Sequence, residues 1–194
     1  PMSARRQRQM CIRDRYLLPE TSYSSKMYDY VKGQYLEGKS WEEARDNVYE
    51  RYQVESKDGY NITSKKLYCN GCFAAGINFA ASLISLFWGE GNLKRTIKIG
   101  TLTGWDSDNP TSTWGGLIGF IIGKKGVEKE FNRKFSEKYF IHRTRQNFDY
   151  EVDDFDNMAN NAIKIITNMV KNEINGRFDE ENQLWYIPQV DQIK

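Results

Sequence analysis

The feature that most constrains the fold is a stretch of small and apolar residues from Cys72 to Trp88. It is apolar on nearly every side of a helical projection, which is the pattern of a helix buried inside a bundle. A membrane-spanning helix needs about 20 mostly apolar residues, whereas this stretch is shorter and contains Asn78, Ser82 and Ser85. The mean hydropathy of −0.73 also argues against a membrane protein. We therefore expect a buried helix and no membrane span.

Helical signals recur on both sides of this stretch. Ser40 and Glu43 form a capping box, Asn92 is placed to cap the next helix, and Asp153 or Asp154 can cap a long final helix. The sequence predicts helices over residues 24–36, 40–52, 70–88, 93–102, 111–122, 129–139 and 153–171. The fold class is therefore predicted to be all-α, a compact multi-helix bundle.

Three further local patterns complete this picture. Spacing in the final helix predicts an inward face made of Met158, Ala162, Ile165, Ile166 and Met169. Glycines recur every four residues at Gly115, Gly119 and Gly123, which favours close helix packing. Residues 183–188 predict a short strand or hairpin.

The first fifteen residues differ from the rest of the chain. They hold five Arg and one Asp, show no periodicity and lack the apolar core of a signal peptide. We expect residues 1–15 to be a non-native or disordered leader, and residues 16–194 to form the domain. The leader has a net charge of +4 and the whole chain +2, which leaves −2 for the remainder. This charge argues against nucleic-acid binding.

Two of the three cysteines form a C-x-x-C pair, Cys69 and Cys72. A structural zinc site needs two more ligands at suitable spacing, and His142 is the sole histidine. We therefore favour two buried thiols at a helix start over a metal or redox role. The odd cysteine, Cys11, argues weakly against a disulfide framework.

The segment with most chemical content is the polar loop at residues 105–110. The carboxylates of Asp106 and Asp108 alternate with Ser107 and Asn109, and such oxygen ligands suit Mg²⁺, Ca²⁺ or Mn²⁺. Residues two apart in an extended loop point the same way, so both carboxylates can converge on one ion. A second interpretation is that Asp108 or Asn109 merely caps the next helix. A calcium loop would also need a Gly and a distal Glu that are missing here.

The order of motifs resembles the C-terminal part of the ADP-ribosylglycohydrolase family. The matching residues are Trp88-Gly-Glu-Gly-Asn-Leu93, Arg95-Thr-Ile97, Gly104-Trp-Asp-Ser-Asp108, and the spaced glycines Gly115, Gly119 and Gly123. The similarity covers residues 40–123 and continues towards residue 188. The combined order of these motifs is more specific than any one of them.

This resemblance implies an all-α fold of the ADP-ribosylglycohydrolase type, Mg²⁺ as cofactor and an ADP-ribose-containing substrate. Asp106 and Asp108 would be metal ligands, and Asn109 stands where the family often has a ligating Thr. Trp105 and Ser107 are candidate substrate contacts. The Trp105 ring could stack on adenine or ribose, or it could anchor the loop in the core.

The family's N-terminal motifs, G-D-(A/S)-x-G and T-D-D, are not found in this sequence. We therefore expect a chain truncated at its N-terminus that supplies the C-terminal half of a metal site and has little activity alone. The leading hypothesis is Mg²⁺-dependent hydrolysis of the glycosidic bond of ADP-ribosylated proteins or related conjugates. The alternatives are a non-catalytic ADP-ribose-binding or structural relative, and a simple calcium-binding helical protein. The sequence assigns no catalytic residue.

Overall fold

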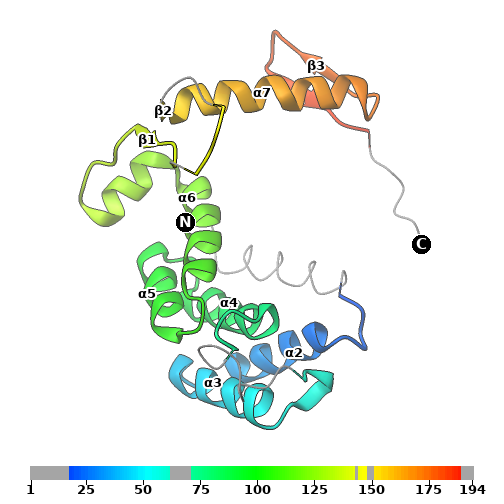
Figure 1. The fold of residues 1–194 in the computed structure, drawn as a ribbon, viewed down its shortest axis with the longest axis vertical. Helices are drawn as coiled ribbons and strands as arrows, with labels where there is room; N and C mark the ends of the chain where they lie inside the picture. The colour runs from blue at the N-terminus through cyan, green and yellow to red at the C-terminus, as the bar shows by residue number, and fades with distance from the viewer. Residues whose placement is uncertain (1–17, 62–70, 143, 148–150, 189–194) are drawn as a thin grey trace. The chain divides into compact units, whose positions relative to one another are not determined.

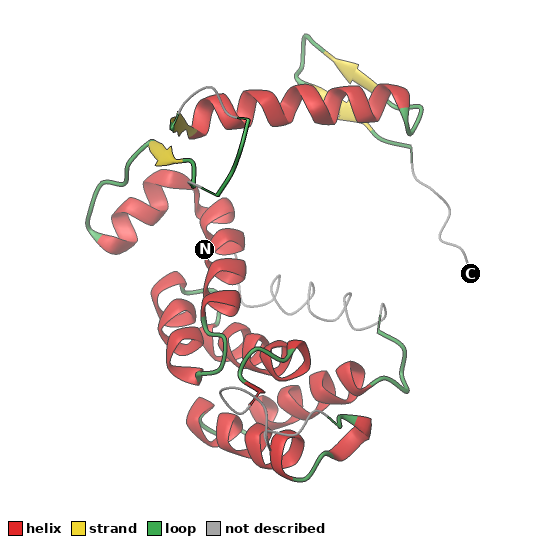
Figure 2. Ribbon diagram, viewed as in Figure 1, coloured by secondary structure: helices red, strands yellow, loops and turns green. Residues whose placement is uncertain are grey.

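The structure is a computed structural model, and it describes residues 18–61, 71–142, 144–147 and 151–188. The described part is mostly helical, with two small antiparallel hairpins (Figures 1 and 2). The chain divides into two units, Pro1–Arg133 and Lys134–Lys194. The mostly helical class expected from the sequence is thus confirmed. The expected leader, residues 1–15, lies outside the described residues.

The described part of the first unit consists of helices joined by turns and loops. Its elements are α2 (Tyr23–Leu36), α3 (Trp41–Val48), the π-helix η1 (Tyr49–Val54), the 3₁₀ turn η2 (Lys57–Gly59), α4 (Ala75–Gly89), α5 (Leu93–Thr103) and α6 (Asp108–Phe131). The capping box is confirmed: Ser40 Oγ accepts from the Glu43 amide, and Glu43 accepts from the Ser40 amide. The Asn92 cap is also confirmed, because its side chain accepts from the Arg95 amide.

Helix α4 lies at the centre of this unit, as its apolar sequence predicted. Ile77 and Ile84 are fully buried and share one core cluster with Met27 and Val31 of α2 and Val48 of α3. Burying an aliphatic side chain of this size stabilises the fold by roughly 1.5–3 kcal/mol relative to leaving it exposed. This core fixes the position of α4, on which the polar loop before α6 depends.

Small residues let α5 pack closely on α4. A Cβ at Gly89 would collide with the Thr96 hydroxyl, and a Cβ at Gly100 would lie 3.0 Å from Ser85 Oγ. Ser85 Oγ donates to the Thr96 carbonyl at 2.8 Å, so the buried hydroxyl has its partner within the same contact. The two helices are therefore locked side by side.

Helix α6 differs from its expected form in three respects. It begins at Asp108 instead of Thr111. It ends at Phe131, so the prediction of a separate helix over residues 129–139 is wrong. Gly123 has φ +69° and breaks the helical path, so it serves a kink and not close packing. Gly115 lies against Ile97 of α5 at an ordinary contact distance of 3.6 Å. Trp114 Nε1 donates to the Ser82 carbonyl at 2.8 Å and holds α6 on α4.

The second unit consists of two hairpins and one helix. Strands β1 (Lys138–Phe140) and β2 (Val152–Asp154) pair antiparallel, with Tyr139 opposite Asp153. Helix α7 (Phe155–Asn172) follows, and β3 (Arg177–Asp179) pairs antiparallel with β4 (Leu184–Tyr186). Asp154 caps α7 by accepting from the Asn157 amide at 2.7 Å. The cap and the final hairpin are both confirmed predictions.

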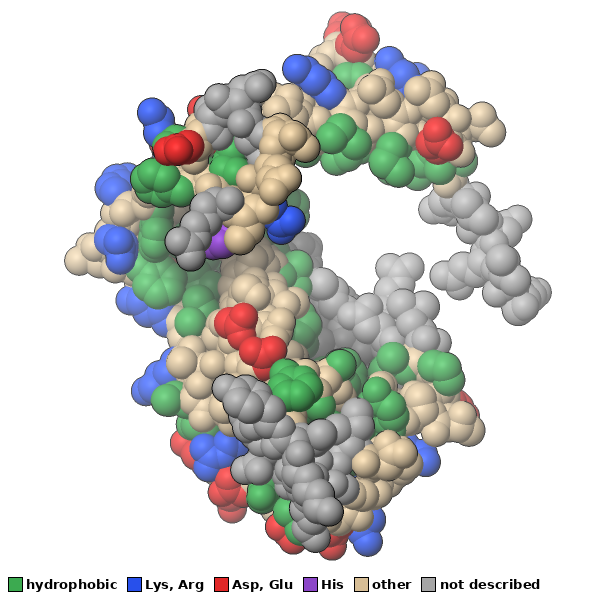
Figure 3. Space-filling view, in the orientation of Figure 1, with side chains coloured by type: hydrophobic (Ala, Val, Ile, Leu, Met, Phe, Trp, Pro, Cys, Tyr) green, Lys and Arg blue, Asp and Glu red, His purple; other side chains and the backbone are tan. Residues whose placement is uncertain are grey.

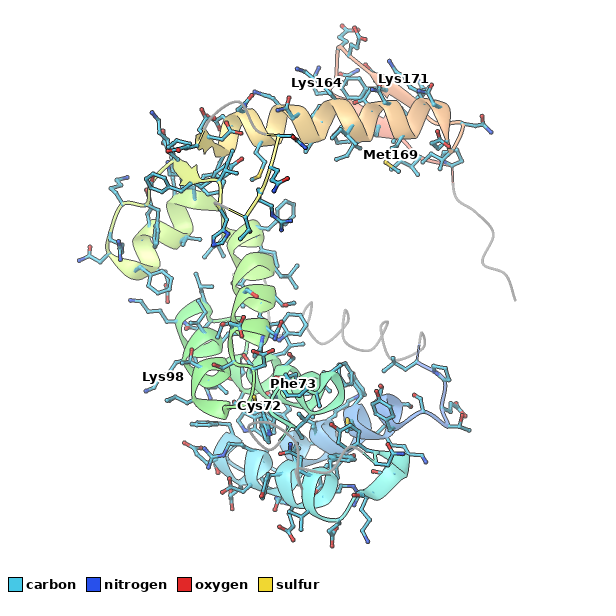
Figure 4. All side chains as sticks on the ribbon, in the orientation of Figure 1. Cys72, Phe73, Lys98, Lys164, Met169 and Lys171 are labelled. Atoms are coloured by element: carbon cyan, nitrogen blue, oxygen red, sulfur yellow. The ribbon has the colours of Figure 1, made fainter. Side chains whose placement is uncertain are left out.

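The apolar face predicted to point inward from α7 is exposed. Met158, Ile165, Ile166 and Met169 are 46%, 60%, 41% and 56% exposed, and Figure 3 shows hydrophobic side chains gathered along this helix. Figure 4 shows Met169 on the opposite side of α7 from Lys164 and Lys171. The final hairpin covers a different face, where Val170 is buried and Trp185 Nε1 donates to Thr167 Oγ1 at 3.0 Å. Within the second unit, the face predicted to point inward is therefore not covered.

No helix within the described ranges has the length and apolar character that a membrane crossing requires.

Candidate metal centre

The polar loop connects α5 to α6 through two left-handed residues. Gly104 has φ +94° and ends α5, and Trp105 has φ +54°. Glycine adopts such angles readily, whereas a bulky side chain pays a steric cost there. Trp105 must therefore be held in this conformation by contacts outside the loop.

One such contact involves the Trp105 indole. Its Nε1 donates to Gln53 Oε1 of η1 at 2.7 Å, and the ring packs against the hydrophobic core while remaining half-buried. Gln53 itself is almost fully buried. This arrangement favours the interpretation of Trp105 as a core anchor of the loop over that of a ring free to stack on a ligand.

A second contact comes from Asn78 of α4. Its Oδ1 accepts from the backbone amide of Asp106 at 3.0 Å. Neither Asn78 nor Gln53 stood out as a functional residue in the sequence. For Asn78 the available signal was its place as an amide within the apolar helix α4, because a buried amide needs hydrogen-bond partners and marks a specific tertiary contact.

The two predicted carboxylates interact where the loop meets α6. Interaction with the Asp108 side chain raises the pKa of Asp106; burial of the carboxyl and the negative charge of Asp108 act in the same direction, and the Asn109 side chain acts against them. Asp106 is half-buried and Asp108 is exposed. Two like charges held this close are relieved either by a shared proton or by a cation.

The helix-cap interpretation of Asp108 and Asn109 is not borne out by the geometry. Ser107 is the N-cap residue of α6, without a side-chain capping bond, and Asp108 lies in the first helical turn. Asn109 Nδ2 donates to the Asp106 carbonyl at 3.3 Å. The Ser107 carbonyl accepts from the Thr111 hydroxyl at 2.8 Å, which stabilises the start of the helix.

The oxygen atoms of the loop provide some of the ligands that a hard cation requires. The loop offers two carboxylates and, from Asn109, an amide oxygen, all of which are ligands that Mg²⁺ accepts. In the described part of the chain, His, Cys, Asp and Glu side chains form no group of three or more that could hold a metal. Water or substrate oxygens would have to complete the coordination, which is usual for Mg²⁺.

Cys72 does not carry the free thiol expected from the sequence. It is disulfide-bonded and half-buried at the turn before α4 (Figure 4). The chain's other cysteines, Cys11 and Cys69, lie outside the described residues. The backbone carbonyl of Cys72 accepts from Asn78 Nδ2 at 2.7 Å, so this turn is connected through Asn78 to the acidic loop.

Glu90, in the turn between α4 and α5, is engaged by neighbouring side chains. Its carboxylate accepts from the Tyr35 hydroxyl at 3.0 Å and from Arg95 Nη1 at 3.1 Å. It has φ +52°, and these bonds stabilise the turn.

Comparison with known proteins finds no relative of this chain. No protein-family model matches the sequence, and searches of curated proteins and of solved structures give no match either.

Proposed function

We propose that this chain acts in Mg²⁺-dependent hydrolysis of the glycosidic bond of ADP-ribosylated proteins or related ADP-ribose conjugates. The observation that carries the proposal is the placement of Asp106 in the loop before α6 and of Asp108 in the first turn of α6, where the two carboxylates interact. Two neighbouring carboxylates favour binding of a compensating proton or cation, because their mutual repulsion lowers the stability of the fold.

The fold-level part of the proposal is an ADP-ribosylglycohydrolase-type helical domain. It is supported by the mostly helical structure and by the order of the motifs along the chain. The apolar helix α4, the turn at Glu90, helix α5 and the acidic loop follow one another as the resemblance implies. In this view α4 and α5 form the scaffold that presents the loop.

Each loop residue has a defined part in the proposed site. Asp106 and Asp108 would hold the cation through carboxylate oxygens, and Asn109 would add its Oδ1, since its Nδ2 donates to the Asp106 carbonyl. A bound Mg²⁺ would supply positive charge that orients the ribose hydroxyls and a water molecule. Ser107 and Trp105 flank the carboxylates as candidate substrate contacts, with the indole N–H already committed to Gln53.

The second candidate is a non-catalytic ADP-ribose-binding relative. It is favoured by the absence, among the described residues, of a third His, Cys, Asp or Glu side chain beside the two carboxylates. It is also favoured by the anchoring of Trp105 in the core. Such a protein would bind ADP-ribose in the presence of Mg²⁺ without cleaving its conjugates.

An assay for released ADP-ribose separates the two candidates. Peptides carrying N- or O-linked ADP-ribose are incubated with the chain and Mg²⁺, and free ADP-ribose is measured by mass spectrometry. The hydrolase proposal expects release that stops in EDTA and in Asp106→Asn. Mg²⁺-dependent binding of ADP-ribose without release supports the second candidate, and neither binding nor release by the folded chain contradicts both.

A further inference from the structure

The side chain of Asn78 uses every hydrogen-bonding group that it has. Its Nδ2 donates to the Cys72 carbonyl at 2.7 Å and to the Ala74 carbonyl at 3.1 Å, and its Oδ1 accepts from the Asp106 amide at 3.0 Å. The residue is 7% exposed. Because two carbonyl groups face one side of the Asn78 amide and a backbone N–H faces the other, the amide has a single favourable orientation, with its oxygen towards the loop.

The loop needs such a support because its backbone is unfavourable. Trp105, the residue before Asp106, has φ +54°, and a conformation of this kind persists when surrounding contacts hold it. Two side chains supply those contacts from different elements: Gln53 binds the Trp105 indole, and Asn78 binds the next amide along the chain. The amide that Asn78 holds belongs to Asp106, which lies two residues before Asp108, the first residue of α6.

We propose that Asn78 is the positioning residue of the acidic pair. By fixing the Asp106 amide, it sets the direction in which the Asp106 carboxylate leaves the backbone and so keeps that carboxylate beside Asp108. Asn78 touches neither the cation nor the substrate and acts through Asp106. This inference rests on the proposed metal site for its ligand, Mg²⁺, whereas the contact between Asn78 and Asp106 stands without it.

The geometry also explains why Asn is suited to this position. Ala would remove all three bonds and leave the Asp106 amide without its partner. Leu has the same branched shape, with two methyl groups in place of the amide oxygen and nitrogen, and removes the same bonds without leaving a cavity, so it separates the polar role from the packing role. Residues that orient metal ligands from outside the coordination sphere typically contribute about 10–100-fold to metal affinity.

The test compares Asn78→Ala and Asn78→Leu with Asn47→Ala as a matched control. Asn47 is a half-buried amide in α3 whose Nδ2 donates to Gln34 Oε1 at 2.7 Å. Mg²⁺ is titrated into each protein by calorimetry, and exchange of the Asp106 amide hydrogen is followed in EDTA by NMR. We expect both Asn78 variants to weaken Mg²⁺ binding at least tenfold and to expose the Asp106 amide to fast exchange. Asn47→Ala should change neither.

The two readouts distinguish the possible failures. If the unsubstituted chain binds no Mg²⁺, the proposed metal function fails, and exchange of the Asp106 amide alone decides whether Asn78 positions the loop. If an Asn78 variant has a melting temperature near that of Asn47→Ala and keeps both Mg²⁺ affinity and a protected Asp106 amide, the inference is overturned. If Asn78→Ala does not fold, Asn78→Leu provides the same comparison.

Discussion

Arg51 and Asp58 are joined by two hydrogen bonds, from Nε to Oδ2 at 3.0 Å and from Nη2 to Oδ1 at 3.2 Å. The Tyr52 hydroxyl donates to the same carboxylate at 2.9 Å. Burial raises the pKa of Asp58, but the bonds from Arg51 and Tyr52 outweigh it, so the net pKa is lowered. Asp58 has φ +60°, and this network holds the turn after η1 in place.

Replacing this carboxylate is expected to destabilise the first unit. Asp58→Asn keeps a residue that tolerates a left-handed backbone and removes the charge, and we expect a loss of about 1–3 kcal/mol in unfolding free energy. Because the folded pKa is below the unfolded value, the contribution is full above the unfolded pKa. It is lost as pH falls through the folded pKa.

Thermal unfolding from pH 7 down to pH 2 checks this prediction. The gap between the melting temperatures of the unsubstituted protein and Asp58→Asn should be widest near pH 7 and close in acid. Asp46→Asn is the control, because Asp46 pairs with Arg45 on the surface and should contribute less than about 1 kcal/mol. A gap that stays constant with pH would contradict the proposed charge contribution.

Two glycine substitutions are expected to change stability in opposite directions: one at the contact between α4 and α5, and one in α2, where there is room for a side chain. In Gly89→Ala the new methyl group would collide with the Thr96 hydroxyl and lie 3.0 Å from the Thr96 Cα, so we expect a loss of about 1–3 kcal/mol. Gly33 in α2 has nothing within 4 Å of the added Cβ, and Gly33→Ala should stabilise the protein by roughly 0.4–1 kcal/mol. Urea unfolding measures both. Equal effects of the two changes would show that α5 does not pack on α4 as described.

Helix α7 presents two faces whose substitutions should differ. Val170 is 3% exposed, and Val170→Ala should cost about 1–3 kcal/mol because a cavity forms where two methyl groups are lost. Ile165 is 60% exposed, and Ile165→Gln should change stability by less than about 0.5 kcal/mol. Denaturant unfolding of the two variants side by side makes the comparison. A large cost for Ile165→Gln would mean that the exposed apolar stripe is covered in solution.

The acidic pair is expected to cost stability when no cation is present. Removing one charge relieves the repulsion between Asp106 and Asp108, so Asp108→Asn should melt at a higher temperature than the unsubstituted protein in EDTA. Added Mg²⁺ should raise the melting temperature of the unsubstituted protein and leave Asp108→Asn unchanged. Differential scanning calorimetry with and without Mg²⁺ measures this. A lower melting temperature for Asp108→Asn in EDTA would assign Asp108 a structural role.

Elements that depend on neighbouring residues could be predicted from the sequence. Ser40, Asn92 and Asp154 each bind an amide three residues ahead, so the sequence alone contained the whole interaction. The buried character of α4 was likewise visible, because its apolar residues lie on all sides. The acidic loop and its place before a helix were also predicted, although α6 begins three residues earlier than expected.

Features that depend on distant residues could not be predicted. The bond between Asn78 and Asp106 spans 28 residues and that between Trp105 and Gln53 spans 52, so no local pattern indicates which residues these side chains bind. The apolar spacing of α7 was read correctly as amphipathic, but spacing does not say what covers an apolar face. Gly123 fits a helical glycine pattern, and the spacing of the glycines does not reveal that its φ is positive and breaks the helix.

The most direct test of the central claim is a calorimetric titration of Mg²⁺ into the folded chain, with and without ADP-ribose, beside Asp106→Asn, Asp108→Asn and the double variant. The account predicts binding that requires both carboxylates and tightens when ADP-ribose is present. Mg²⁺ binding that persists unchanged in the double variant, or no binding by the folded chain in the presence of ADP-ribose, would contradict a metal site at Asp106 and Asp108.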